Sequence, residues 1–407
     1  MKIKCRPEDF FVDELAEVRP GSQGPLGLYL LEKRGLSTLE AIGELARRVN
    51  RRPSDISAGG LKDKYALTRQ HVTIPGRPIP PLRLRGLRLE PLGRVASPMT
   101  AAELRGNRFA IVLRDLPDGA GRAIAERAER AAVQGLPNYF DEQRFGSLRG
   151  RKGFIARRLI EGDFEGALRM HLGSPSKLDS SNVREQRQRA ERLWGRWEEL
   201  FRALPKSNDR SVVAFLRDHP GEFARAFELI EHRLSQLYLF AYQSYLWNEI
   251  LGRVLERQAG AGGIFRIPYA AGELRFVDRL SPELLEPLRE LVIPLPARKA
   301  EYPAGALADS ATEVLAAEQM TLERLRLKGT ERLQFRGGER HALVFPANLR
   351  AAGEQPDDLY PGRRKLRLDF ALPPGSYATI LIKFVARELL PGSRAARNRG
   401  RRKRRNR

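Results

Sequence analysis

The sequence lacks the residues that would point to a disulfide-rich, metal-binding or membrane protein. It contains one cysteine, Cys5, which excludes an intramolecular disulfide and any zinc site built from several cysteines. Its five histidines are scattered, and no two stand at ligand spacing on a helix. No apolar run reaches the roughly 18 residues that a membrane span needs, and the first residues lack a signal-peptide core. We therefore expect a cytoplasmic protein without a metal ion and without a membrane segment.

What the sequence does have is length and positive charge. Its 407 residues, 42% hydrophobic and 30% charged, suffice for two or three soluble domains. Lys and Arg number 73 against 50 Asp and Glu, for a formal net charge of +23. Such an excess favours a polyanionic partner, because each neutralised phosphate releases condensed counterions. A charge excess that serves only solubility is the alternative.

Part of this charge lies in a C-terminal tail, Pro391 to Arg407. The tail has nine Arg or Lys and no acidic residue. Removing these nine charges from +23 leaves +14 for residues 1–390, so the body is basic as well. The tail has no apolar periodicity, and we expect it to be disordered and to contact nucleic acid without sequence specificity.

Local patterns predict mixed strands and helices in the N-terminal third. Short apolar runs bounded by polar residues predict strands at 10–12, 27–31 and 108–114. Ser37 and Glu40 form a capping box, in which each side chain satisfies a free backbone amide of the other. The apolar residues that follow have the 3.6-residue period of an amphipathic helix.

From about residue 164 the pattern changes to long helices. Helical spacing of apolar and aromatic residues predicts helices at 185–204 and 222–258, and the aromatic rings of the second are interpreted as core. The last folded section returns to strands, predicted at 363–370 and 378–385. This order predicts one mixed domain interrupted by a helical one.

Several nucleotide and hydrolase motifs are missing. The sequence has no P-loop and no Gly-x-Ser-x-Gly elbow. Gly119-Ala-Gly121 stands where a dinucleotide-binding loop would lie, but Ile124 occupies the position of the third small residue. We interpret this segment as a plain turn between a strand and a helix.

The densest polar cluster runs from Ala58 to His71. Its two glycines allow a tight turn and a close approach to a ligand. Asp63 stands between Lys62 and Lys64, with Arg69 close behind, and neighbouring cations favour an ionised carboxylate. An ionised carboxylate on a glycine-rich loop can act as a nucleophile or general base in a phosphate-binding cleft. A simple turn residue or helix cap is the alternative.

Two later segments carry side chains suited to a nucleotide. The amide of Asn138 can read a base edge, Phe140 can stack on a base, and Arg144 can hold a phosphate. The alternative is a well-packed loop. Near the C-terminus Tyr377 offers another stacking face, and Lys383 follows it.

Three motifs together resemble the signatures of the TruD family of tRNA pseudouridine synthases, in the same order and with similar spacing. The likeness covers most of residues 1–163 and about 345–390. The motifs are Gly60-Leu-Lys-Asp63-Lys-Tyr-Ala-Leu-Thr-Arg-Gln70, Pro137-Asn-Tyr-Phe-Asp-Glu-Gln-Arg-Phe-Gly146 and Leu372-Pro-Pro-Gly-Ser-Tyr-Ala-Thr379.

The resemblance implies an α+β fold, with a pseudouridine synthase catalytic domain interrupted by a family-specific, helix-rich α/β insertion domain. The catalytic domain would have a mixed, largely antiparallel sheet with flanking helices. The implied reaction is isomerisation of uridine to pseudouridine in tRNA, expected at position 13, without cofactor or metal. The expected parts are 1–164 and 345–390 for the catalytic domain, 165–344 for the insertion and 391–407 for the tail.

The family's functional residues can be placed on matching positions. Asp63 matches the catalytic aspartate, which starts cleavage of the N1–C1′ glycosidic bond. Asn138 and Phe140 match an Asn-x-Phe that contacts the flipped uracil. Tyr29 and Tyr377 stand where the family usually has an aromatic residue at the substrate.

Four basic residues are weaker candidates for contacts to RNA or for ion pairs. Lys62, Arg69 and Arg144 lie within the matched motifs, and Lys383 is a candidate ionic partner of Asp63. For Lys383, a solvated lysine on a strand is the alternative.

Two other functions remain to be weighed. One is a noncatalytic RNA-binding protein on the same fold, for which the basic tail would suffice; the retained Asp63 speaks against it. The other is a synthase that acts on another RNA. No obligate protein partner is evident from the sequence.

Overall fold

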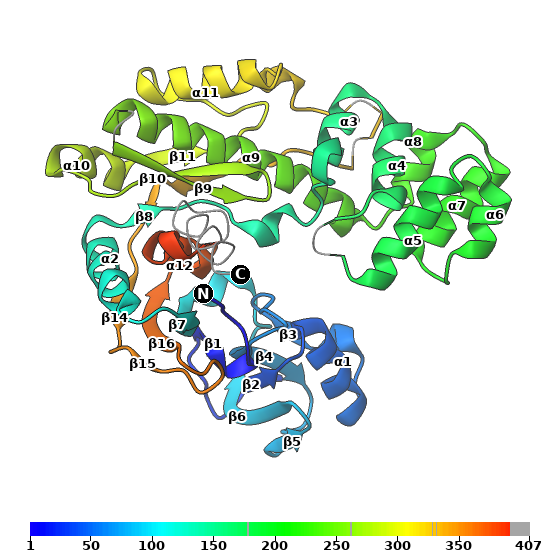
Figure 1. Cartoon of the computed structure of the whole chain (residues 1–407). Helices are drawn as coiled ribbons and strands as arrows, with labels where there is room; N and C mark the ends of the chain where they lie inside the picture. Colours follow the sequence, from blue (N-terminus) through cyan, green and yellow to red (C-terminus); the bar gives the residue numbers. More distant parts are fainter. Residues whose placement is uncertain (177–178, 261–262, 328, 331, 391–407) are drawn as a thin grey trace. The chain divides into compact units, whose positions relative to one another are not determined.

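The computed structural model describes most of the chain (Figure 1). The described residues are 1–176, 179–260, 263–327, 329–330 and 332–390. The basic tail predicted at 391–407 lies outside them. Among the described helices, none is both long and apolar enough to cross a membrane.

The chain divides into two compact units, and the first is built from both of its ends. The first unit comprises Met1–Leu136 and the chain from Val344, and the second comprises Pro137–Leu343. The predicted order, a mixed domain interrupted by a helical one, is therefore present. The first crossing between the units falls after Leu136, however, rather than at residue 164.

The first unit contains a ten-stranded sheet, largely antiparallel as the family resemblance implies. Its strand order is β14-β16-β7-β1-β4-β2-β6-β5, with β15 paired to β16 and β3 to β4. Among these pairs only β1 and β4 run parallel. The strands are β1 (Phe10–Ala16), β2 (Leu26–Arg34), β3 (Ser57–Ala58), β4 (Leu67–Pro75), β5 (Leu82–Leu84), β6 (Leu87–Val95), β7 (Leu104–Leu116), β14 (Ala347–Ala351), β15 (Gln355–Pro356) and β16 (Arg364–Leu372).

In the described part of the first unit, three α-helices accompany this sheet: α1 (Thr38–Arg48), α2 (Ala120–Gln134) and α12 (Ala378–Val385). The predicted capping box of α1 is confirmed, because the Glu40 amide donates to Ser37 Oγ over 3.2 Å and the Ser37 amide donates to Glu40 Oε2 over 2.7 Å. The apolar face of α1, including Leu45, packs in one core cluster with Leu31 of β2 and Val72 of β4. Burial of this face anchors α1 beside the loop that precedes β4.

The second unit is mostly helical, with a few short strands. Its elements are α3 (Ile155–Glu161), α4 (Phe164–Gly173), α5 (Ser181–Arg192), α6 (Trp197–Ala203), α7 (Asn208–Asp218), α8 (Phe223–Glu228), α9 (His232–Ala259), β9 (Ile264–Tyr269), β10 (Gly272–Val277), α10 (Pro282–Glu290), β11 (Val292–Pro294), α11 (Ala306–Ala317) and β12 (Glu339–His341). Strands β8 (Leu136–Pro137) and β13 (Leu343–Val344) lie at the two crossings between units. Helix α9 is buried along most of its length, and its rings Tyr238, Tyr242 and Trp247 belong to the core, as the sequence predicted for the aromatics of this segment.

The prediction of a strand at 378–385 is wrong, because this segment is helix α12. Gly375 has φ +78° and turns the chain after β16, and α12 then packs on α2. Six of its eight residues are buried, and the other two, Thr379 and Lys383, are polar and stand four residues apart, as on one face of a helix. The short apolar run with isoleucine and valine predicted a strand, but this spacing of four is that of a helix.

The two long helices predicted in the second unit are each broken. The helix predicted at 222–258 is interrupted between α8 and α9 by the side chain of Asn208. Its Nδ2 donates to Leu229 O over 2.9 Å, and its Oδ1 accepts from the Glu231 amide over 3.2 Å, so the amide replaces helical hydrogen bonds. The helix predicted at 185–204 is interrupted between α5 and α6, where Gly195 has φ +85°.

Candidate active site

Asp63 lies in the first unit on the segment 59–66 between β3 and β4, which we call the aspartate loop. Side chains from neighbouring elements hold its backbone. Gln70 Nε2 donates to Gly60 O over 3.2 Å, and the Lys62 amide donates to Thr38 Oγ1 over 2.9 Å. A Cβ on Gly59 would lie 2.7 Å from Thr100 O, so this position requires glycine. The loop is therefore fixed before any substrate arrives.

Contacts with Tyr65 and Lys4 orient the Asp63 carboxylate. Its Oδ1 accepts a hydrogen bond from the Tyr65 amide over 2.8 Å, and its Oδ2 forms an ion pair with Lys4 Nζ. The Lys4 ammonium also lies 4.3 Å from the centre of the Phe10 ring. The Asp63 side chain keeps 14% of its surface exposed, so the carboxylate is held in place but remains accessible.

Lys33 is a second amine beneath the aspartate loop, and it is 1% exposed. Its Nζ donates to Leu36 O and to Asp63 O, each over 2.7 Å. Burial, opposed in part by the charge of Asp63, lowers the pKa of Lys33 to about 8. Lys33 thus fixes the backbone of the catalytic candidate while Lys4 contacts its carboxylate.

Lys62 points into the protein rather than toward solvent. Its Nζ lies 2.7 Å from Glu14 Oε2 and donates to Asn107 Oδ1 over 2.7 Å, and only 7% of its side chain is exposed. Burial acts to raise the pKa of Glu14, but hydrogen bonds from His71 and the charge of Lys62 outweigh it and hold that pKa below its usual value. The structure therefore shows an ion pair for Lys62 and leaves it too buried to meet an RNA phosphate.

Arg69 is also engaged within the sheet of the first unit. Its Nε lies 2.7 Å from Glu32 Oε2 on the neighbouring strand β2, and its guanidinium lies 5.6 Å from the centre of the Phe11 ring. With 43% of its side chain exposed, Arg69 keeps a surface that RNA can reach, and an RNA contact there stays a prediction.

Tyr29 is a core residue, which corrects its assignment to the substrate. It is 2% exposed within the cluster of β2, β4 and α1, and its hydroxyl accepts a hydrogen bond from the Ile79 amide over 2.9 Å. A base has no open ring face to stack on, because neighbouring apolar side chains cover the ring.

Lys383 belongs to helix α12 rather than to a strand, and Tyr377 is the residue that immediately precedes this helix. Lys383 lies in the last turn, and both residues are half-buried. The Asp63 carboxylate forms an ion pair with Lys4. A pairing of Lys383 with Asp63 and a substrate contact by Tyr377 stay predictions.

In the second unit the residues 138–140, which we call the Asn-Tyr-Phe segment, are organised by Arg340 of β12. Arg340 donates through Nε to Asn138 O over 2.6 Å and through a terminal nitrogen to Asn138 Oδ1 over 2.7 Å. Asn138 Nδ2 donates to His341 O over 3.2 Å. Because a guanidinium has only donors, it fixes which end of the Asn138 amide faces it.

The Phe140 ring lies among aromatic and cationic groups of the same unit. It meets Trp247 edge to face, with ring centres 5.5 Å apart, and the guanidinium of Arg340 lies 4.2 Å from its centre. Arg144 lies 5.3 Å from the same ring, so its guanidinium is held at Phe140 as a cation–π partner. Asn248 donates to Phe140 O and accepts from the Phe140 amide, each over 2.9 Å.

Chemically, the aspartate loop offers one positioned carboxylate beside an ammonium, which can attack carbon or take a proton. Within the described residues there is no group of three or more His, Cys, Asp or Glu side chains that could hold a metal ion. Sequence reasoning missed Lys4, Lys33, Arg340 and Asn248. Lys33 and Lys4 lie in segments that the resemblance already covered, but their distance from Asp63 along the chain concealed the contacts.

Proteins of known sequence and structure are similar to this chain along nearly its whole length. A family model described as tRNA pseudouridine synthase D (TruD) matches residues 1–385. A homologue from Methanococcus maripaludis, named a tRNA pseudouridine synthase D, is 31% identical over 395 residues, covering 95% of this chain and 99% of its own. The tRNA pseudouridine synthase D of Aquifex aeolicus is 30% identical over 394 residues, covering 94% and 97%. A crystal structure of a TruD protein from Methanosarcina mazei superposes with a TM-score of 0.71 at 25% identity, covering 94% and 92%.

Proposed function

The chain belongs to the TruD family of tRNA pseudouridine synthases, and from this premise we propose that it converts uridine 13 of tRNA to pseudouridine with Asp63 as the catalytic residue. The family assignment gives the reaction class, isomerisation of uridine in tRNA. The observation that carries the residue assignment is the Asp63 carboxylate, held on a fixed loop, paired with Lys4 and still partly exposed. We expect the enzyme to act on tRNA in the cytoplasm.

The reaction is an isomerisation and balances without an oxidant or reductant. The N1–C1′ bond breaks, the uracil turns, and a C5–C1′ bond forms; the C5 hydrogen leaves as a proton and N1 gains one. Asp63 begins this sequence by one of three routes open to a carboxylate, which are attack on C1′, addition to C6 or removal of a sugar proton. The ion pair with Lys4 and the hydrogen bond from the Tyr65 amide hold the carboxylate in one orientation for each of them.

Base recognition is assigned to the Asn-Tyr-Phe segment. The target nucleotide has to leave its stack, which costs a few kcal/mol that stacking on protein rings and phosphate contacts offset. We propose that the Asn138 amide binds the uracil edge, that the Phe140 ring supports the base and that Tyr377 provides a further aromatic face. The Arg340 contacts support this role, because they fix the amide orientation that a base would meet.

Tritium release from [5-³H]uridine-labelled tRNA tests the proposal, since each turnover frees the C5 hydrogen. We expect release by the wild type and none by Asp63→Asn, while the affinity for tRNA changes less than about twofold because an uncharged isostere removes few phosphate contacts. Asp118→Asn is the matched control, since its side chain is 79% exposed in a surface ion pair with Arg364. It should retain wild-type turnover.

Three results would redirect the assignment. Comparable turnover by Asp63→Asn would overturn its catalytic role. Release from a tRNA in which cytidine replaces uridine 13 would move the target to another position. Tight binding without release from any RNA would favour the noncatalytic RNA-binding protein.

A further inference from the structure

Lys4 is held at Asp63 by a segment that is attached on both sides of it. Upstream, the amide and carbonyl of Lys2 exchange hydrogen bonds of 2.8 and 2.9 Å with the backbone of Arg114 on β7. Downstream, the Arg6 amide donates to Asp9 Oδ2 over 2.9 Å. Lys4 itself has φ +56°, a conformation that a residue with a side chain seldom adopts, so surrounding contacts must maintain it.

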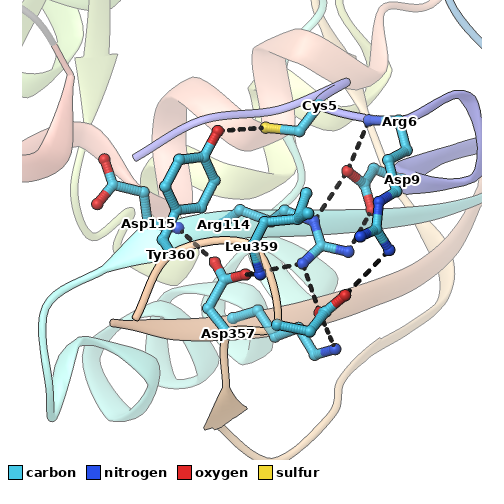
Figure 2. Close-up of polar contacts among 10 residues, drawn as sticks. Cys5, Arg6, Asp9, Arg114, Asp115, Asp357, Leu359 and Tyr360 are labelled. Atoms are coloured by element: carbon cyan, nitrogen blue, oxygen red, sulfur yellow. Dashed lines mark hydrogen bonds and ion pairs between the residues drawn. The ribbon is translucent and has the colours of Figure 1, made fainter. Parts of the chain in front are cut away.

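Arg114 joins these two attachments. Its guanidinium binds both oxygens of Asp9, Nε to Oδ2 over 2.9 Å and a terminal nitrogen to Oδ1 over 2.8 Å. The other terminal nitrogen donates to Asp357 over 2.8 Å and to Asp358 over 2.7 Å (Figure 2). Arg114 is 4% exposed and Asp9 and Asp357 are buried, so these three residues are sheltered from water, whereas Asp358 lies at the surface.

The acidic partners of Arg114 are themselves fixed. Asp357 accepts from the amides of Asp115 and Leu359, each over 2.9 Å, and these contacts are drawn in Figure 2. From the same C-terminal stretch, Tyr360 contacts the N-terminal segment directly: its hydroxyl lies 3.5 Å from Cys5 Sγ, and Lys2 Nζ lies 4.1 Å from its ring centre. The segment carrying Lys4 is thus joined through Arg114 to residues beyond the second unit in sequence.

We propose that Arg114 is a positioning residue for catalysis, which holds the N-terminal segment at Lys2 and Asp9 and so keeps the Lys4 ammonium on the Asp63 carboxylate. The inference rests on the proposed function, because it assigns Arg114 an effect on Asp63 chemistry through Lys4. It requires arginine: a lysine is a point charge, which cannot bind Asp9 through two nitrogens and Asp357 through a third.

The test is a double-mutant cycle between Arg114 and Lys4, in which tritium release from tRNA measures the turnover of each variant. Arg114→Lys should lower kcat at saturating tRNA by about ten- to a hundredfold, because small displacements of a catalytic partner have effects of that size. KM should change less than about twofold. In the Lys4→Met background the same Arg114→Lys change should lower kcat less than about twofold, because the Lys4 ammonium through which Arg114 acts on Asp63 is absent.

Arg127→Lys is the matched control for a buried arginine in the same unit. Arg127 is 8% exposed, donates to Val385 O over 3.0 Å and forms an ion pair with Glu388. It should leave kcat within about twofold of wild type in both backgrounds. If Arg114→Lys does not fold, Asp9→Asn replaces it, with a smaller loss in kcat that again disappears in the Lys4→Met background.

Equal losses from Arg114→Lys with and without Lys4 would overturn the proposal, as would a loss confined to KM. Wild-type kcat in Lys4→Met would overturn it too, because Arg114 would then have nothing to position. Failure of the proposed function has a separate signature, since it would appear as retained turnover in Asp63→Asn.

Discussion

The aspartate loop and the Asn-Tyr-Phe segment carry two parts of one family signature, yet different interactions hold them. Around Asp63 the holding groups include amines beside neutral groups such as the Gln70 amide: Lys4 contacts the carboxylate, buried Lys33 contacts the carbonyl, and Lys62 is turned inward onto Glu14. Around Phe140 they are an asparagine amide, a guanidinium and an indole edge.

The lysine amines near Asp63 can titrate, whereas the amide and the guanidinium at Phe140 do not. A lysine amine changes charge within an accessible pH range when it is buried, whereas an amide has no such change and arginine stays protonated. We therefore expect pH to alter the support of the aspartate loop and to leave the support of the Asn-Tyr-Phe segment unchanged. The following predictions test this difference.

The largest effect is expected from Lys33. Its pKa is lowered from 10.5 to about 8, so between those values the unfolded chain binds a proton that the folded chain has released. Stability must then rise with pH through this window, by up to roughly 3 kcal/mol, and be lost again as the pH falls through about 8. Chemical denaturation of wild type and Lys33→Met at pH 7, 8, 9 and 10 measures it. A constant difference between the two unfolding free energies across this range would contradict the prediction.

Asn248→Ala should cost about 2 kcal/mol, because it leaves the buried amide and carbonyl of Phe140 without their side-chain partner. Hydrogen exchange at the Phe140 amide reports this locally, and we expect faster exchange in the variant. The cost should be the same at pH 7 and pH 9.5. If this cost depended strongly on pH, the expected difference between the aspartate loop and the Asn-Tyr-Phe segment would be contradicted.

Arg340→Lys should lower kcat/KM about tenfold, or roughly 1.4 kcal/mol, with little change in melting temperature. The lysine keeps the charge but cannot donate to both Asn138 O and Asn138 Oδ1 while covering the Phe140 ring. Arg350→Lys on an exposed position of β14 is the control and should match wild type. Unchanged kcat/KM in Arg340→Lys would show that the amide orientation is fixed by other contacts.

Local chemistry made part of the fold predictable. The Ser37 and Glu40 side chains act within one turn, and the strand runs beginning near Phe10 and Gly27 are short-range patterns, so both elements were found. Helix α12 was missed because its short apolar run resembles a buried strand. The break between α8 and α9 was missed because the interrupting side chain, Asn208, comes from another helix.

In the candidate site, too, short-range features could be predicted and long-range contacts could not. The motif residues could be located from the sequence, because they are contiguous and match a family pattern. Their supports could not, since Lys4 is 59 residues from Asp63 and Arg340 is 202 residues from Asn138. Tyr29 shows the converse error: an aromatic in a motif-like strand was assigned to the ligand, although the strand is covered by a helix and its ring fills the core.

The first unit is built from both ends of the chain, so its two parts leave the ribosome at different times. Arg114 leaves the ribosome 243 residues before Asp357, a delay of roughly 12–50 s at usual elongation rates. During that time β7 has no β16 beside it, and its open edge is a template for wrong pairing. The continuous second unit is complete before β16 emerges. Premature termination between Val344 and Arg364 would therefore yield a chain with a finished second unit and an unclosed catalytic sheet, a natural substrate for chaperones and proteases.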